Sequence, residues 1–431
     1  MSDVTMLPTD SAREPTREPA ESSRTCRPGK SVFGKTAPAF WTLAILLTST
    51  IIAPASAREG TSLPWSAAPS TAIVTESKTF QNGNVELSGT LYLPRDGQEL
   101  AAVVVTHTAS KPLREALLYQ HLKEMLPPLG IAVLAYDRRG SGQSGGNLKD
   151  SDYAMLANDA IAAVQMLKAD ARIDPKRIGI WGLSQGGWLS LLAAASSSDV
   201  RFVVSISAPV VTPDVQMMFR SENSLRINGY SEADIDQMRA TRQAVDDYMR
   251  GTGDRAGAQR LVDAAKSKPW FDLLYMGETV GDRATSRWRR EIEYDPLPTL
   301  DQVKVPALIL FGANDPVVPV ATSVARINAR LRPNMTMRVI AGADHHMATS
   351  MTPTAQMNLT LSNRVRPDAL EYFSILASWM TGQDIARIHR SRPLSQAHSS
   401  DETIEGGLRT DLEDHHWPFT TARQNYHAAG R

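Results

Sequence analysis

Short, strongly apolar runs that alternate with amphipathic stretches constrain the fold of this chain more than any other feature of its sequence. Strands covered on both faces have such a composition, because neither face meets water. The alternation predicts an α/β fold, in which helices cover both faces of a mostly parallel sheet. The strands are expected at residues 101–105, 131–136, 177–181, 200–206, 305–311 and 335–340, and the helices at about 114–126, 153–169, 186–195 and 368–380.

Two segments interrupt this alternation, one before the first parallel strand and one after the fourth. Residues 72–80 and 85–93 alternate between apolar and polar side chains around Asn82-Gly83-Asn84, which predicts an antiparallel hairpin. Residues 214–294 are charged and helical in character, with no strand-like run. We therefore expect a helical cap, inserted at about 213–298 and placed over the strand ends, where open α/β sheets bind ligands.

The N-terminal 57 residues predict a disordered leader followed by an export signal. Lys30 and Lys35 precede an apolar stretch at residues 40–53, and Ala55-Ser56-Ala57 follows it. A basic flank, a short apolar stretch and an A-x-A site are the features of a cleaved secretory signal. We expect cleavage after Ala57 and a secreted or periplasmic protein. The alternative is an uncleaved membrane anchor, for which the stretch is short.

Composition then sets the domain boundaries. Residues 58–70 are expected to form a linker, residues 71–381 the α/β domain with its cap, and residues 382–431 a polar, disordered tail. The single cysteine, Cys26, excludes an intramolecular disulfide and a cysteine-based metal site. Lys plus Arg and Asp plus Glu number 46 each, so the net charge gives no support for a nucleic-acid partner. We expect no metal and no cofactor.

A serine stands between glycines directly after the third parallel strand. Gly182-Leu183-Ser184-Gln185-Gly186 matches the pattern G-x-S-x-G. By itself the pattern is weak, since chance produces it in roughly one chain in seven of this length. Its position between a strand and a helix is the setting of a serine nucleophile, and glycines permit the close backbone approach that such a turn requires. Ser184 is the candidate nucleophile, and a serine helix cap is the alternative.

Two later turns supply the other residues that a serine nucleophile needs, a base and a carboxylate that orients it. Asp315 lies in the turn after the strand that follows the insertion, and His345 and His346 come after the next strand. The order serine, acid, histidine is the one expected in this architecture. The Gly-Ala-Asp-His spacing favours His345 over His346. Asp344 adjoins the histidine in sequence, so we expect its side chain to point elsewhere and to cap the turn.

With these residues identified, the chain resembles the α/β-hydrolase superfamily over about residues 72–381. Within it, the chain is similar to secreted serine esterases that carry an Asp-Arg-Arg-Gly-x-Gly-x-Ser segment, here Asp137-Arg138-Arg139-Gly140-Ser141-Gly142-Gln143-Ser144. The resemblance includes the spacing of the triad and the segment Tyr294-Asp295-Pro296, which leads out of the cap. It implies the α/β-hydrolase fold and catalysis by Ser184, Asp315 and His345.

The resemblance also implies an oxyanion hole, with one departure from the usual pattern. Relatives carry His-Gly-x after the first parallel strand, and the backbone N–H of x helps to bind the oxyanion. This chain has His107-Thr108-Ala109, so Thr108 replaces the glycine. By position, the implied donors are the N–H groups of Ala109 and Gln185. His107 is expected to be a structural residue of the loop rather than a base.

Three functions follow, all without a cofactor. The first is a serine hydrolase that cleaves a small-molecule carboxylic ester through an acyl-enzyme. The second keeps the same residues but cleaves amide bonds of short peptides, and no N-terminal propeller supports it. The third is a non-catalytic α/β-hydrolase fold used for binding, which Thr108 favours and the complete Ser-Asp-His set opposes. A membrane partner is expected only if the signal segment stays uncleaved.

Overall fold

The computed structural model describes residues 72–358, 361 and 364–382. The predicted leader, signal segment and linker, and all of the predicted tail except Gly382, lie outside this range. None of the helices in the described range is long and apolar enough to cross a membrane.

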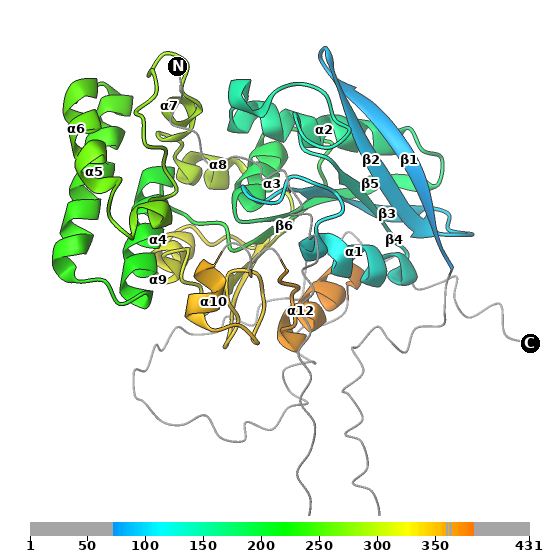
Figure 1. Ribbon diagram of the computed structural model, residues 1–431. Coiled ribbons are helices and arrows are strands. Elements are labelled where there is room, and N and C mark those ends of the chain that lie inside the picture. Colours follow the sequence, from blue (N-terminus) through cyan, green and yellow to red (C-terminus); the bar gives the residue numbers. More distant parts are fainter. Residues whose placement is uncertain (1–71, 359–360, 362–363, 383–431) are drawn as a thin grey trace, which may run out of the picture. The chain divides into compact units, whose positions relative to one another are not determined.

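Eight strands of the described chain form one sheet, in the order β1-β2-β4-β3-β5-β6-β7-β8 (Figure 1). β1 pairs antiparallel with β2 and β2 antiparallel with β4, and every other neighbouring pair is parallel. The predicted α/β fold class is therefore confirmed. The bounds are β1 Ile73–Asn82, β2 Val85–Pro94, β3 Leu100–Thr106, β4 Ile131–Tyr136, β5 Ile173–Leu183, β6 Phe202–Ile206, β7 Ala307–Gly312 and β8 Met335–Ile340.

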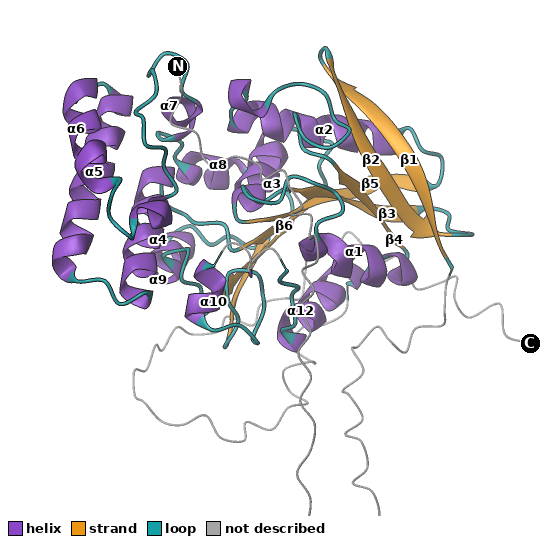
Figure 2. Cartoon of the chain, viewed as in Figure 1, coloured by secondary structure: helices purple, strands orange, loops and turns teal. Residues whose placement is uncertain are grey.

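Helices cover both faces of this sheet (Figure 2). Successive residues of β3 show why the strand is apolar throughout: Ala102 and Val104 join the core under α2, α3 and α9, whereas Val103 and Val105 join the core under α1 and α12. A strand that feeds two cores has no polar face to alternate with. These helices are α1 Gln120–Met125, α2 Tyr153–Lys168, α3 Gln185–Ser196, α9 Val320–Asn328 and α12 Leu370–Thr381.

Two local features differ from the sequence expectation. The helix expected at 114–126 is shorter, because the chain enters it through the 3₁₀ turn η1 (Leu117–Tyr119), and Arg114 uses its N–H to bind the Asp137 carboxylate instead. The helix α9 was not predicted. The remaining short elements are η2 Pro127–Leu129, η3 Leu148–Asp150 and α10 Pro353–Met357.

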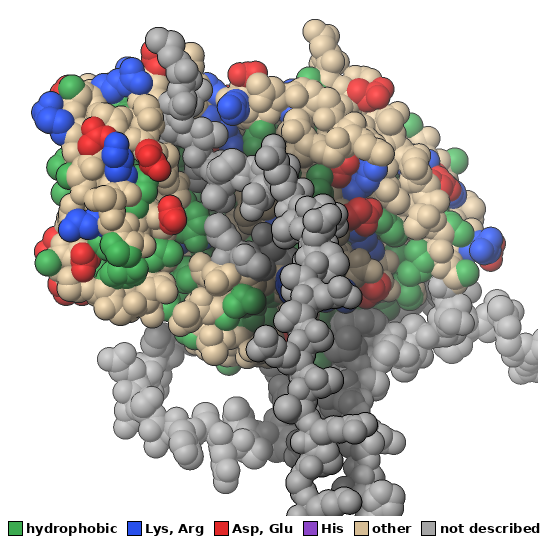
Figure 3. Space-filling view, viewed as in Figure 1, with side chains coloured by type: hydrophobic (Ala, Val, Ile, Leu, Met, Phe, Trp, Pro, Cys, Tyr) green, Lys and Arg blue, Asp and Glu red, His purple; other side chains and the backbone are tan. Residues whose placement is uncertain are grey.

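The segment between β6 and β7 is helical, as its sequence predicts, and has a hydrophobic core of its own. Acidic and basic side chains are interspersed over the outer face of α5 and α6 (Figure 3). On the inner side, α4 donates from the Gln216 and Asn223 amides to the Val317 and Pro316 carbonyls, in the turn that carries Asp315. The elements are α4 Pro213–Ile227, α5 Glu232–Arg250, α6 Arg255–Ala265, η4 Phe271–Leu274, α7 Arg287–Glu291 and α8 Pro296–Gln302.

Candidate active site

Ser184 occupies a strained turn between β5 and α3. Its φ of 59° and ψ of −122° lie outside the regions that ordinary residues prefer, at a cost on the order of 1–3 kcal/mol. The Ser184 N–H donates to the Ile206 carbonyl of β6, which holds the turn against the next strand. The side chain is half-buried, between a buried strand and a buried helix. Its hydroxyl is thus at the carboxyl edge of the sheet.

The glycines on either side of Ser184 are required by close approach of the backbone. A Cβ at Gly182 would collide with the Gly186 carbonyl oxygen, and a Cβ at Gly186 would lie 2.6 Å from the Thr106 carbonyl oxygen. Thr106 closes the same turn, because its hydroxyl donates to the Gly186 carbonyl at 2.8 Å. The G-x-S-x-G pattern is therefore a packing requirement of the turn that exposes the serine.

The structure brings Asp315 and His345 together from the turns after β7 and β8. The His345 Nδ1 lies 2.8 Å from the Asp315 Oδ2, and both side chains are buried. The other carboxylate oxygen of Asp315 accepts the N–H groups of Val317 and Val318, at 2.8 and 3.0 Å. With both oxygens engaged, Asp315 is fixed in position and holds the His345 ring through Nδ1.

The neighbouring residues Asp344 and His346 have different partners. The Asp344 Oδ1 accepts the N–H groups of His346 and Ala348, so this carboxylate shapes the turn that displays His345. Burial, together with the positive charge of Lys111, lowers the pKa of His346 well below its ordinary value. No described residue bonds the His346 Nδ1. Within the described chain, no carboxylate contacts the Nδ1 of His346 to orient its ring, as Asp315 orients His345.

Both candidate oxyanion donors are free of described acceptors. Gln185 is the first residue of α3, where an N–H has no partner within the helix. In the loop after β3, Ala109 is exposed, and no residue of the described chain accepts its N–H. The Thr108 N–H is already used, since it donates to the Tyr119 hydroxyl. Of the two N–H groups, the one without an acceptor in the described chain is therefore that of Ala109, and its role as an oxyanion donor stays a prediction.

Arg138, from the Asp-Arg-Arg-Gly segment, holds this loop in place. Its guanidinium donates to the carbonyl oxygens of Thr108 and Ala109 at 3.1 and 3.2 Å, and lies 3.4 Å from the Gln185 amide oxygen. One buried arginine thereby connects the two candidate oxyanion donors. Sequence reasoning quoted Arg138 only as part of a family segment and assigned it no role.

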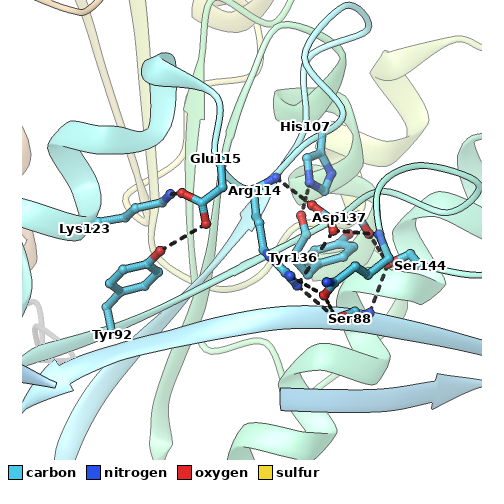
Figure 4. Close-up of polar contacts among 10 residues, drawn as sticks. Ser88, Tyr92, His107, Arg114, Glu115, Lys123, Tyr136, Asp137 and Ser144 are labelled. Atoms are coloured by element: carbon cyan, nitrogen blue, oxygen red, sulfur yellow. Dashed lines mark hydrogen bonds and ion pairs between the residues drawn. The ribbon is translucent and has the colours of Figure 1, made fainter. Parts of the chain in front are cut away.

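Asp137, the residue before Arg138, is the centre of a polar network shown in Figure 4. Its carboxylate accepts the N–H groups of Arg114 and Gln143 at 3.0 Å, and its carbonyl accepts the Ser144 hydroxyl at 2.6 Å. The Arg114 guanidinium donates to the Ser88 hydroxyl and to Gln143. We call these residues the Asp137 network. They bind the hairpin to the loops at the strand ends.

His107 has the structural role expected from the sequence. Its Nε2 lies 2.5 Å from the Tyr136 carbonyl oxygen, and the ring packs edge-on against Tyr119 and Tyr136. Burial lowers the pKa of His107 to about 3, with the Arg138 charge acting in the same direction. The ring therefore stays neutral at physiological pH.

Four side chains next to the Asp315–His345 pair leave buried polar atoms without a partner in the described chain. We call Lys111, Arg220, Asp344 and His346 the unpaired cluster; the atoms are Nζ, Nε, Oδ2 and Nδ1, respectively. Sequence reasoning missed Lys111 and Arg220. Only the position of Lys111, two residues after Ala109, indicated that it belongs to the site.

Comparison with models of known protein families identifies the class to which this fold belongs. The family model described as the alpha/beta hydrolase fold matches residues 114–348, more than half of the 431 residues. The chain therefore belongs to the α/β-hydrolase family.

Curated relatives match parts of the chain. An uncharacterized Escherichia coli protein of the traX-finO intergenic region is 26% identical over 194 residues, 44% of this chain and 64% of its own length. Thiohydrolase apmlB of Arthrinium phaeospermum is 35% identical over 126 residues, 29% of this chain and 40% of its own length. The chain thus spans less than two thirds of these relatives.

Solved structures of esterases are also similar. The Pyrococcus furiosus esterase Pf2001 has 21% identity and a TM-score of 0.42, with 64% of this chain and 84% of that chain covered. Est1E of Butyrivibrio proteoclasticus, solved with ferulic acid, has 17% identity and a TM-score of 0.42, with 62% and 91% covered.

Proposed function

We propose that this protein is a serine hydrolase that cleaves carboxylic esters. The observation that carries the proposal is the 2.8 Å contact between His345 and Asp315, made at the same edge of the sheet as the strained turn of Ser184. A serine hydroxyl is a weak nucleophile unless a neighbouring base takes its proton. An oriented histidine at this edge meets that need.

In the proposed reaction, the Ser184 Oγ attacks the ester carbonyl carbon while the His345 Nε2 takes the hydroxyl proton. The carbonyl oxygen becomes an oxyanion, and the N–H groups of Gln185 and Ala109 stabilise it. His345 returns the proton to the alcohol oxygen as the C–O bond breaks, which leaves an acyl-enzyme. Water, deprotonated by the same histidine, then releases the acid and restores Ser184.

A fluorophosphonate probe tests the nucleophile directly, because it forms a covalent bond with an activated serine and not with an ordinary one. We expect labelling at Ser184 alone, none in Ser184→Ala and a large decrease in His345→Ala. His346→Ala is the matched control and should remain labelled. If the folded protein takes no label, the chain is a binding protein rather than a hydrolase. If His346→Ala loses the label and His345→Ala keeps it, His346 is the base.

A second candidate substrate is a thioester, which the similarity to a thiohydrolase favours. The same residues serve both reactions, since the thiolate leaves in place of the alcohol. Rates on matched nitrophenyl esters, acyl thioesters and aminoacyl nitroanilides separate the possibilities. We expect the esters to react fastest, and a preference for the nitroanilides would establish the peptidase alternative instead.

A further inference from the structure

The unpaired cluster contains two cations that face the Asp315–His345 pair from different parts of the fold. Lys111 comes from the loop after β3, and Arg220 comes from the inserted helix α4. The charges of both act on His346, and Arg220 also interacts electrostatically with Asp315. Loop and inserted helix therefore bring two positive charges near enough to act on each other and on His346, beside the candidate catalytic residues.

Lys111 is unusual because it is buried and its ammonium group makes no direct ion pair within the described chain. Its side chain is only 4% exposed, and no described residue hydrogen-bonds or ion-pairs with its Nζ. Burial and the nearby charge of Arg220 lower the pKa of Lys111 to about 8, while Asp344 opposes this shift. An ammonium group in such a place is costly unless something pairs with it.

The loop and the cap hold the two cations in position without using their free donors. The Lys111 carbonyl accepts the Tyr119 hydroxyl at 2.7 Å, so the backbone at this residue is fixed. The Arg220 guanidinium lies 3.4 Å from the centre of the Tyr275 ring, and its Nε has no acceptor in the described chain. Tyr275 also hydrogen-bonds the Arg220 side chain, and these two contacts hold the guanidinium while the Nε–H stays available.

We propose that Lys111 and Arg220 together bind a carboxylate of the substrate, so that the preferred esters carry a free carboxylate besides the bond that is cleaved. This inference rests on the proposed esterase function. Two converging donors with positive charge match a carboxylate, which accepts through two oxygens. The carboxylate of the substrate would then balance the positive charges of Lys111 and Arg220.

Asp344 is the acidic member of the unpaired cluster, and its protonation state affects which ligand charge the cluster favours. Burial raises the pKa of its carboxyl, while two backbone N–H groups stabilise Oδ1. A proton on Oδ2 would make this atom a third donor to the ligand. The charged groups that act on Lys111 are Arg220 and Asp344 itself, and Lys111 in turn acts on His346.

Matched pairs of substrates test the proposal. Monoethyl adipate and ethyl hexanoate have the same chain length in the acyl group, and only the first carries a carboxylate. The butyric ester of γ-hydroxybutyrate and butyl butyrate place the same difference on the alcohol side. We expect kcat/KM to be about tenfold to a hundredfold higher for the charged member of one pair. The pair that shows it identifies the side that carries the carboxylate.

Variants then assign the preference to the two cations. Lys111→Met and Arg220→Met should each reduce the ratio of kcat/KM between charged and neutral members to within about threefold of one, whereas Lys111→Arg should keep most of it. The exposed lysine Lys176 provides the control, since Lys176→Met should leave the ratio unchanged.

The outcomes separate this inference from the esterase function. If neutral esters are cleaved but neither charged substrate is preferred, or if both methionine variants keep the preference, the carboxylate site is refuted and the esterase stands. If no ester is cleaved, calorimetry on Ser184→Ala decides the point. Monoethyl adipate should bind this variant at least tenfold more tightly than ethyl hexanoate, and equal binding would refute the site.

Discussion

Two buried polar regions flank the loop after β3, and they differ in how completely they are bonded. In the Asp137 network, every buried polar atom of the side chains has a partner within the described chain. In the unpaired cluster, each of the side chains has one buried polar atom without such a partner. Each region combines buried and half-buried side chains. In the Asp137 network Asp137 and Ser144 are buried and Gln143 is exposed, whereas in the unpaired cluster only Arg220 is half-buried and the other three are buried.

The contrast separates residues whose polar groups are bonded within the fold from residues whose buried polar groups are left without a partner in the described chain. A buried polar group without a partner costs about 1–3 kcal/mol, and a fully bonded network avoids that cost. The Asp137 network fits a purely structural role, because it connects the hairpin β1–β2 with the loops that carry Arg114 and Arg138. The unpaired cluster retains its cost unless a polar ligand or water enters.

The largest expected effect lies at the edge of the unpaired cluster, where two carboxylates differ in their partners. Asp315→Asn removes the charge that orients His345, while an amide oxygen can still accept the N–H groups of Val317 and Val318. We expect kcat on a nitrophenyl ester to decrease by about 10³–10⁴ with little change in folding. The control is Asp344→Asn, which should cost less than about tenfold; the reverse order would show that Asp344 is the acid.

The second prediction concerns a substitution that disrupts the Asp137 network. Asp137→Ala leaves the N–H groups of Arg114 and Gln143 without their acceptor and removes the buried carboxylate that ion-pairs with the Arg114 guanidinium, which keeps its bonds to Ser88 and Gln143. We expect the free energy of unfolding to decrease by about 3 kcal/mol, measured by urea denaturation. Asp96→Ala, at an exposed position, should change it by less than about 0.5 kcal/mol. A decrease below about 1 kcal/mol for Asp137→Ala would mean that water replaces the network.

In the unpaired cluster, replacing a charged side chain by an apolar one should increase the free energy of unfolding rather than decrease it. The folded protein holds the pKa of Lys111 at about 8, below its ordinary value of 10.5, so the charged lysine destabilises the fold below pH 8. We expect Lys111→Met to raise the free energy of unfolding by about 3 kcal/mol at pH 7. This gain should disappear as the pH rises from 8 to 10.5, because the wild-type lysine loses its proton. A stability loss at pH 7 would show that Lys111 is paired after all.

The smallest effect is the loss of unfolding free energy at low pH that is caused by His107, which lies beside the Asp137 network. His107 is neutral in the folded protein down to a pKa of about 3, whereas the unfolded chain binds a proton below about 6.5. Stability is therefore lost as the pH falls from 6.5 toward 3. At pH 5 this residue contributes about 2 kcal/mol of destabilisation. In His107→Gln the amide can still donate to Tyr136, so the decrease between pH 7 and 5 should be smaller by that amount in urea denaturation.

Much of the architecture was predictable because its causes are local in sequence. The apolar runs of β3, β4 and β7 predict strands buried on both faces, and the glycines around Ser184 predict the turn that the packing of Thr106 requires. The missed helix α9 is only nine residues long and begins directly after Pro319, at the end of the turn that carries Asp315. Asp315 and His345 were predicted from the order of residues along the chain. They meet because each follows one of two neighbouring parallel strands, whose carboxyl ends lie at the same edge of the sheet.

What the sequence by itself determined is therefore the fold class, the family and the turns that carry Ser184, Asp315 and His345. Only the tertiary structure decided which polar groups are satisfied. Lys111 and Arg220 are more than a hundred residues apart, and nothing in either local sequence marks a cation as buried or unpaired. Hydrogen bonding inside a protein depends on which atoms meet from distant segments, so pairing, and the lack of it beside His345, emerges only when the chain is folded.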